Sequence, residues 1–129
     1  MFVNELTIGS IQEQVMSQPS WDVVETSIRN LDGGSCDGVA LNGPNNSYMG
    51  VAGGEEGRYV IAGYLHGLGS YICASGEEEG PSQNVVVAGD YNTYPSKNVV
   101  GIEIVVEAAK AFFERGVLLE RLKWEKQQL

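Results

Sequence analysis

Positive charge, histidine and cysteine are scarce in this sequence of 129 residues, which has 8 Lys and Arg, 1 His and 2 Cys against 17 Asp and Glu. Proteins that bind nucleic acid contact its phosphates through clustered Lys and Arg, so the composition disfavours direct nucleic-acid binding. The single imidazole, His66, does not favour a zinc site, which takes several His or Cys ligands. Cys36 and Cys73 stand 37 residues apart without a CxxC spacing. This predicts two ordinary thiols in a reducing compartment, with a disulfide as the alternative.

The sequence also lacks long apolar runs: a helix that crosses a bilayer needs about 20 consecutive apolar residues, and no run approaches this length. The segment Met1–Glu5 has no basic region followed by an apolar stretch, so we expect no export signal and a cytoplasmic location. Hydrophobic residues make up 43 % of the sequence and charged residues 19 %, which is typical of a globular protein. The length suits one domain, and we assign residues 1–129 to it.

What the sequence has in excess is negative charge, and the excess is uneven. The net charge is −9, with −10 on residues 1–96 and +1 on residues 97–129. Such a surface can serve solubility, or it can steer the protein toward a basic partner. Charge alone does not decide between the two.

The first residues predict a strand and then a short helix. The segment 2–8 alternates loosely and is expected to form a strand. Ser10 and Glu13 then fit a capping box, in which each side chain accepts a hydrogen bond from a backbone N–H at the start of a helix. This predicts a helix over 11–17, which ends before Pro19 because the residue before proline avoids the helical region.

Two further helices are predicted from apolar periodicity. Ser20 can cap a helix over 21–31, whose apolar residues recur at helical spacing. The segment 102–115 carries apolar and charged residues on opposite faces, and Gly116 ends it as a left-handed cap. We expect Trp124, a few residues further on, to pack against this helix.

Between the helices, residues 37–94 alternate β-favouring segments with Gly, Asn and Pro clusters. The predicted strands are 39–41, 48–51, 58–64, 70–74 and 85–88. Their connections are too short for parallel crossovers, so neighbouring strands should be antiparallel. The predicted fold class is α+β, with an antiparallel sheet of about five to six strands packed against the amphipathic C-terminal helix and short N-terminal helices.

No pattern for catalysis or cofactor binding emerges. His66 has no neighbouring acid to orient it as a base. The segment 90–95 begins like a calcium loop, but it has Tyr where a ligand is needed and Pro where the turn needs Gly. The Gly-rich segment 53–57 carries two acidic residues, which would repel a phosphate. We therefore expect no catalytic residues, no metal and no cofactor.

Four stretches match a known family in order along the chain, between about residues 20 and 125. They are Trp21-Asp22-Val23-Val24 through Leu31-Asp32-Gly33; Gly53-Gly54-Glu55-Glu56-Gly57-Arg58-Tyr59-Val60-Ile61; Val85-Val86-Val87-Ala88-Gly89 with Tyr94-Pro95 and Val99-Val100; and Glu107 through Gly116 with Leu122-Lys123-Trp124-Glu125. In these stretches the sequence resembles the immunity proteins of bacterial polymorphic-toxin systems, in the family that is numbered first (Imm-one type). The region 67–81 matches less well.

The resemblance implies an α+β protein that binds and blocks a cognate toxin, often a nucleic-acid-modifying enzyme such as a deaminase or a nuclease. An enzyme of that class carries a basic cleft, which an acidic inhibitor can occupy. From charge and expected exposure, and not from any family motif, we predict that acidic loops and one tyrosine contact the toxin. These partner-binding residues are Glu55, Glu56, Tyr71, Glu77, Glu78 and Glu79.

Two other classes of function stay open at this point. A small-ligand-binding module or enzyme would use a pocket between sheet and helix near His66 and Asp90, with convergent polar groups. A structural subunit would expose a large apolar patch and self-associate. The sequence does not predict the oligomeric state.

Overall fold

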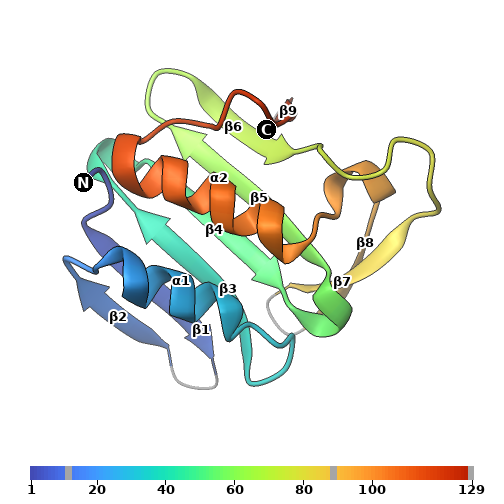
Figure 1. Cartoon of the computed structure of the whole chain (residues 1–129), viewed down its shortest axis with the longest axis horizontal. Coiled ribbons are helices and arrows are strands. Elements are labelled where there is room, and N and C mark those ends of the chain that lie inside the picture. Colours follow the sequence, from blue (N-terminus) through green and yellow to red (C-terminus); the bar gives the residue numbers. More distant parts are fainter. Residues whose placement is uncertain (11–12, 88–89, 128–129) are drawn as a thin grey trace.

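A seven-stranded antiparallel sheet forms the centre of the molecule, with strand order β2-β1-β3-β4-β5-β6-β9 (Figure 1). The computed structural model describes residues 1–10, 13–87 and 90–127. The strands of this sheet are β1 (Glu5–Ser10), β2 (Gln14–Ser17), β3 (Cys36–Asn42), β4 (Tyr48–Gly53), β5 (Tyr59–Leu65), β6 (Gly69–Cys73) and β9 (Trp124–Gln127).

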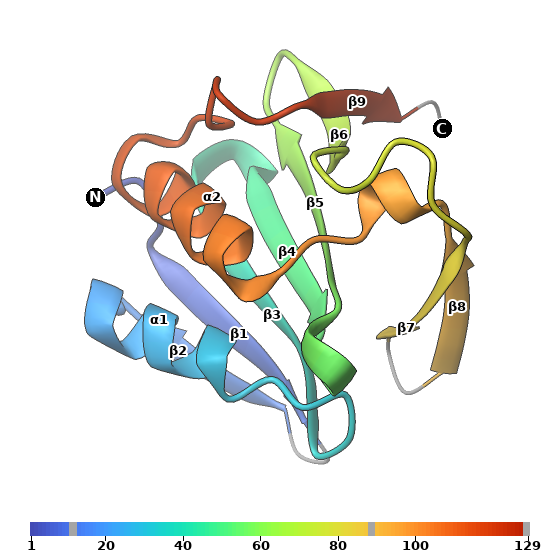
Figure 2. The same ribbon diagram turned by 45° about the vertical axis from the view of Figure 1, so that its right-hand side comes forward.

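Two helices lie on one face of this sheet, and a separate hairpin stands on its other side (Figure 2). The helices are α1 (Trp21–Arg29) and α2 (Ile102–Arg115), and the hairpin consists of β7 (Gln83–Val87) and β8 (Asp90–Tyr94). Short 3-10 turns connect elements at η1 (Pro44–Asn46), η2 (Glu55–Gly57) and η3 (Ser96–Asn98). The α+β class with an antiparallel sheet and a C-terminal helix is thus confirmed. None of the described helices is long and apolar enough to span a membrane.

Capping residues mark the start of α1 and the end of α2 where the sequence predicts, whereas α1 ends at Arg29, two residues before its predicted end. The Ser20 hydroxyl accepts a hydrogen bond from the Val23 N–H at 3.3 Å, at the start of α1. At the end of α2, Gly116 adopts φ 67° and ψ 34°, a left-handed conformation that glycine takes without strain. Trp124 packs against the main core, and its indole N–H donates to the Leu119 carbonyl at 3.0 Å.

The main core lies between the helices and one face of the sheet. Alternate residues of β1, β3, β4 and β5 point to this face, and the fully buried ones are large: Leu6, Leu41, Met49, Val51 and Ile61. From α2, Val105 and Phe112 pack into the same cluster. Removing these side chains from water is the main apolar contribution to folding.

The helix predicted over 11–17 is wrong for the part that the structure describes. Residues 14–17 form β2, which pairs antiparallel with β1 in a register that sets Glu5 opposite Ser17 and Ile8 opposite Gln14; residues 11–12 lie outside the described part. All four β2 residues are exposed. The capping pattern is a local signal, and pairing with the free edge of β1 outweighs it.

The sheet region also departs from the expected simple meander. The segment predicted as a strand over 85–88 pairs with β8 in the separate hairpin instead of joining the main sheet. The edge strands β2 and β9 bring the main sheet to seven strands, above the predicted five to six. Cys36 and Cys73 are free thiols on β3 and β6, with β4 and β5 between them.

Candidate functional site

Five carboxylates gather at one end of the sheet, and this group is called the acidic end below. It comes from three segments that are far apart in the sequence: the α1–β3 connection with the start of β3, the turn η2, and the start of β8 (Figure 2). Its members are Asp32, Asp37, Glu55, Glu56 and Asp90.

Asp32 organises the connection between α1 and β3. Its Oδ1 accepts hydrogen bonds from the N–H groups of Gly34 at 2.8 Å and Cys36 at 3.0 Å, and its Oδ2 accepts from the Ser35 hydroxyl at 2.8 Å. These hydrogen bonds hold the pKa of Asp32 below its ordinary value, and the bond from the Cys36 N–H has the largest effect. The carboxylate therefore stays ionised and adds a fixed negative charge to the acidic end.

Glycine lets η2 come close to this connection. Gly54 has φ 111°, and a Cβ there would lie 2.3 Å from the Leu31 carbonyl oxygen. A Cβ on Gly33 would lie 2.8 Å from the Glu55 Cβ. Any larger residue would push the two segments apart, so these glycines keep Asp32 and Glu55 at one end of the sheet.

Tyr91 joins the hairpin to η2. Its hydroxyl lies 2.8 Å from each carboxylate oxygen of Glu55, although the side chain is 65 % exposed. The hydrogen bond to Glu55, followed by the charges of Glu55 and Glu56, raises the pKa of Tyr91. Glu56 forms an ion pair with Arg58 at 3.6 Å. Glu55 therefore holds the hairpin as well as adding charge.

Burial and two carboxylates act together on the Cys36 thiol. Burial raises its pKa most, and the charges of Asp32 and Asp37 raise it further. A thiol with a raised pKa stays protonated and is a poor nucleophile. The acidic end is therefore suited to attracting cations and not to thiol chemistry.

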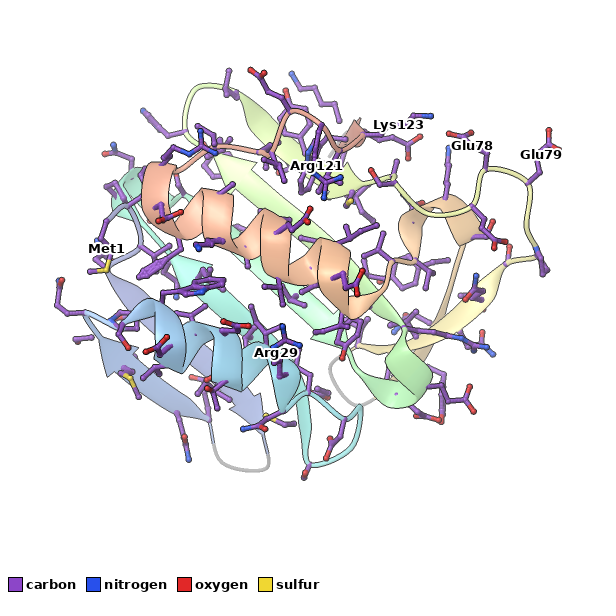
Figure 3. The ribbon with its side chains drawn as sticks, in the orientation of Figure 1. Met1, Arg29, Glu78, Glu79, Arg121 and Lys123 are labelled. Atoms are coloured by element: carbon purple, nitrogen blue, oxygen red, sulfur yellow. The ribbon has the colours of Figure 1, made fainter. Side chains whose placement is uncertain are left out.

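The second predicted acidic loop, Glu77–Glu79, lies partly beside η2. Glu77 lines a hollow of about 430 Å³ together with Gly57 and Arg58. The Ser96 hydroxyl donates to the Glu77 carbonyl at 2.6 Å and so anchors the loop. Glu78 forms an ion pair with Lys123 at 3.2 Å, and Figure 3 shows Glu78 and Glu79 at the outer margin of the molecule. The structure brings Glu77 toward η2 and leaves the other two further out.

Tyr71 is not part of this group. It sits on β6 opposite Gly63 and Lys126, on the helix side of the sheet and toward the β5–β6 turn. That turn lies at the end of β5 opposite η2. The tyrosine that meets the acidic end is Tyr91. The sequence analysis chose Tyr71 instead, because the contact of Tyr91 with Glu55, 36 residues away, leaves no local signal in the sequence.

His66 and Asp90 do not share a pocket. His66 is exposed in the β5–β6 turn, where its backbone N–H donates to the Ser47 hydroxyl at 3.1 Å. Asp90 lies beside Tyr91 near η2, at the other end of the sheet. Among the residues with described positions, no group of three or more His, Cys, Asp and Glu could hold a metal ion.

A groove of about 370 Å³ lies on the sheet face away from the helices. Its floor consists of small residues from four neighbouring strands, and the hairpin forms one wall. The floor residues are Gly9, Gly38, Ala40, Gly50, Ala52 and Ala62, and the wall includes Val87 and Tyr94. Sequence reasoning missed this groove, although the alternation of small and large residues in Gly38-Val39-Ala40-Leu41 and Met49-Gly50-Val51-Ala52 indicates a sheet with one shallow face.

Neither the protein-family models nor the curated proteins give a significant match to this sequence.

Proposed function

We propose that this chain is an immunity protein of the first-numbered polymorphic-toxin family, which binds a cognate toxin and covers its basic active-site cleft. One observation supports this most: carboxylates from three separate segments converge on the acidic end. Arg58, which pairs with Glu56, offsets only part of their charge. A toxin that acts on nucleic acid, such as a deaminase or a nuclease, would present the complementary basic surface.

The proposed inhibition has an electrostatic and a steric part. A net charge of −9 attracts a basic enzyme over a distance of several ångströms and raises the rate of encounter. After docking, carboxylates such as Glu55 and Glu56 take the places of substrate phosphates in the cleft. Substrate is then excluded by occupancy, without any chemical step.

The proposed contact surface includes the residues predicted from the sequence. Glu55 and Glu56 belong to the acidic end, and Glu77 lies across the neighbouring hollow from η2. Glu78 and Glu79 extend this surface outward. Tyr71 would join it only if the toxin also reached around the sheet to β6, so we rank it as the least central of these contacts.

The test is to co-express the chain with the toxin domain that is encoded beside it and to measure survival and the dissociation constant. Two variants remove charge from the proposed surface: Glu55→Gln with Glu56→Gln, and the triple alanine variant of Glu77–Glu79. A matched control, Glu103→Gln with Glu114→Gln, removes the same charge as the first variant from the exposed face of α2.

We expect the Glu55 and Glu56 variant to weaken binding by about 10- to 100-fold and the control by less than about threefold. Glu55→Gln also changes the contact with Tyr91, so a circular dichroism spectrum must show that the variant stays folded. If the unaltered chain neither protects the cell nor binds the toxin domain, the proposed function is wrong. Undiminished binding by the triple variant would remove only the Glu77–Glu79 loop from the interface.

A further inference from the structure

The groove on the open face is a built feature of the sheet. Four neighbouring strands place Gly or Ala on this part of the open face, which leaves a hollow there, while core residues such as Leu41 and Met49 point to the helices. The hairpin closes one side of the groove through a small apolar cluster, in which Val60 packs with Val85 and Val99. The partly buried Tyr94 packs against this cluster. Tyr48, which stacks on Tyr64 with ring centroids 6.5 Å apart, borders the groove at the end away from η2.

Charge at the groove is of one sign. Asp37 lines it at the acidic end, and none of the 8 Lys and Arg, all of which have described positions, does so. Several cations lie on the helix side instead, where Figure 3 shows Arg29 and Arg121 beside the helices. A second copy of this chain would bring no positive charge to Asp37 if the two grooves faced each other. The groove is thus matched to a partner that carries both apolar and cationic groups.

The shape favours a protruding segment over a small molecule. Small-ligand sites bury most of the ligand surface and fix it with several convergent polar groups. This groove is open to solvent, and its floor offers Cα and Cβ atoms with few polar side chains. A side chain such as Leu, Phe or Met from a partner loop would fill such a hollow by apolar contact.

We infer that the groove receives one or two large apolar side chains from a loop of the toxin, and that a Lys or Arg next to them on that loop meets Asp37. This inference rests on the proposed function and names a second contact area of the same complex. The acidic end then guides the toxin, and the groove supplies the apolar anchor that slows its dissociation.

Gly50 offers a direct test because a side chain there would fill the groove. A Cβ on Gly50 would lie 3.8 Å from the nearest atom, the Ala62 carbonyl oxygen, and the residue has no positive φ. Gly50→Leu should therefore fold and occupy the space that the toxin side chain needs. Ala52→Leu, on the same floor, is the second variant in case Gly50→Leu unfolds. Ser70→Leu on β6 adds the same side chain to the same face outside the groove and is the matched control.

The measurement is the dissociation constant for the toxin domain encoded beside the chain, together with thermal unfolding of each variant. We expect Gly50→Leu to weaken binding by about 100-fold or more and Ser70→Leu by less than about threefold. Asp37→Asn should weaken binding by about three- to tenfold and reduce its dependence on salt.

Each contrary result has a separate meaning. If the unaltered chain binds the toxin domain and a folded Gly50→Leu or Ala52→Leu binds it equally well, the groove inference is wrong and the proposed function stands. If the unaltered chain does not bind, both are wrong. Sedimentation that shows a dimer of the unaltered chain and a monomer of Gly50→Leu would assign the groove to a second copy. Native mass spectrometry that finds a small molecule bound to the unaltered chain but not to Gly50→Leu would assign the groove to that ligand, and this too would overturn the inference.

Discussion

The two faces of the seven-stranded sheet differ in the size of their side chains, and this difference separates stability from recognition. On the helix side, Leu6, Leu41 and Ile61 are fully buried under α1 and α2. On the open side, Ala40, Gly50 and Ala62 are only half-buried, and part of this face is covered by the hairpin together with Val99, which follows η3. A sheet needs one buried face to be stable. The other face is thus available for a partner. Substitutions on the helix side should lower stability, whereas substitutions on the open side should weaken binding of the partner.

The sharpest test of this comparison uses two consecutive residues of β1. Leu6 is fully buried among the core residues, whereas Thr7 points to the groove. We expect Leu6→Ala to lower the free energy of unfolding by about 2–5 kcal/mol, since it leaves a cavity under the helices. Thr7→Ala loses only the hydrogen bond that Asn42 donates at 3.2 Å, and should cost less than about 1 kcal/mol. Urea denaturation measures both. Equal losses would contradict the division between the faces.

The helix side of the sheet could be predicted largely from the sequence because its signals are periodic. In α2 the apolar residues recur at helical spacing and Gly116 has a single suitable role, so its bounds agree with the structure. In α1 the Ser20 cap gives the correct start at Trp21, whereas the helix ends at Arg29, two residues before the predicted end. Such patterns are local, and tertiary contacts reinforce them.

The edges and the open face could not be predicted because their residues carry weak local signals. The strands β2, β8 and β9 are short and bury none of their residues fully, so their pairing depends on a partner strand and not on their own alternation. The glycines of the groove, such as Gly38 and Gly50, are ordinarily typical of turns, yet here they lie within strands. The acidic end was predicted only through Glu55 and Glu56, since its other members come from distant segments that folding brings together.

Glycine substitutions test the same comparison between the two faces, with a smaller expected change in the free energy of unfolding. Gly63 and Gly50 lie on neighbouring strands but point to opposite faces. A Cβ on Gly63 would lie 2.9 Å from the Tyr48 carbonyl oxygen, so Gly63→Ala should lower the free energy of unfolding by about 1–3 kcal/mol. Gly50→Ala meets no close atom and should raise it by up to about 1 kcal/mol, because it restricts the unfolded chain. The same denaturation experiment applies, and destabilisation by both variants would show that the open face is as tightly packed as the helix side.

Acid should weaken contacts on both sides of the sheet. Hydrogen bonds lower the pKa of Asp32, in the connection from α1, and of Glu125, which Lys97 holds at 2.7 Å on β9. A carboxyl whose pKa is lowered by folding stabilises the protein above its ordinary pKa, here 3.8 and 4.5. That stability is lost as the pH falls from these values through the lower pKa of the folded state.

The measurement is the free energy of unfolding at neutral pH and at about pH 3 for the unaltered chain, Asp32→Asn and Glu125→Gln. We expect each variant to lose less stability on acidification than the unaltered chain does. The matched control is Glu103→Gln, which removes a carboxyl from the exposed face of α2. An acid response that is the same in all four proteins would show that neither carboxylate contributes.

The smallest expected effect concerns the hairpin, which covers part of the open face together with Val99. Its base is held by apolar packing of Val85 and Tyr94, while Tyr91 and Glu55 hold the other end. The Tyr91 side chain is exposed, so Tyr91→Phe should leave the global unfolding transition unchanged. It should instead raise hydrogen-exchange rates of β7 and β8 amides by a small factor, roughly two- to fivefold, because the hairpin opens locally more often. Tyr94→Phe removes a hydroxyl from the same strand without loss of a described hydrogen bond, and should not change these rates. If both variants exchange like the unaltered chain, the contact with Glu55 does not hold the hairpin in place. The wall of the groove would then depend on apolar packing alone.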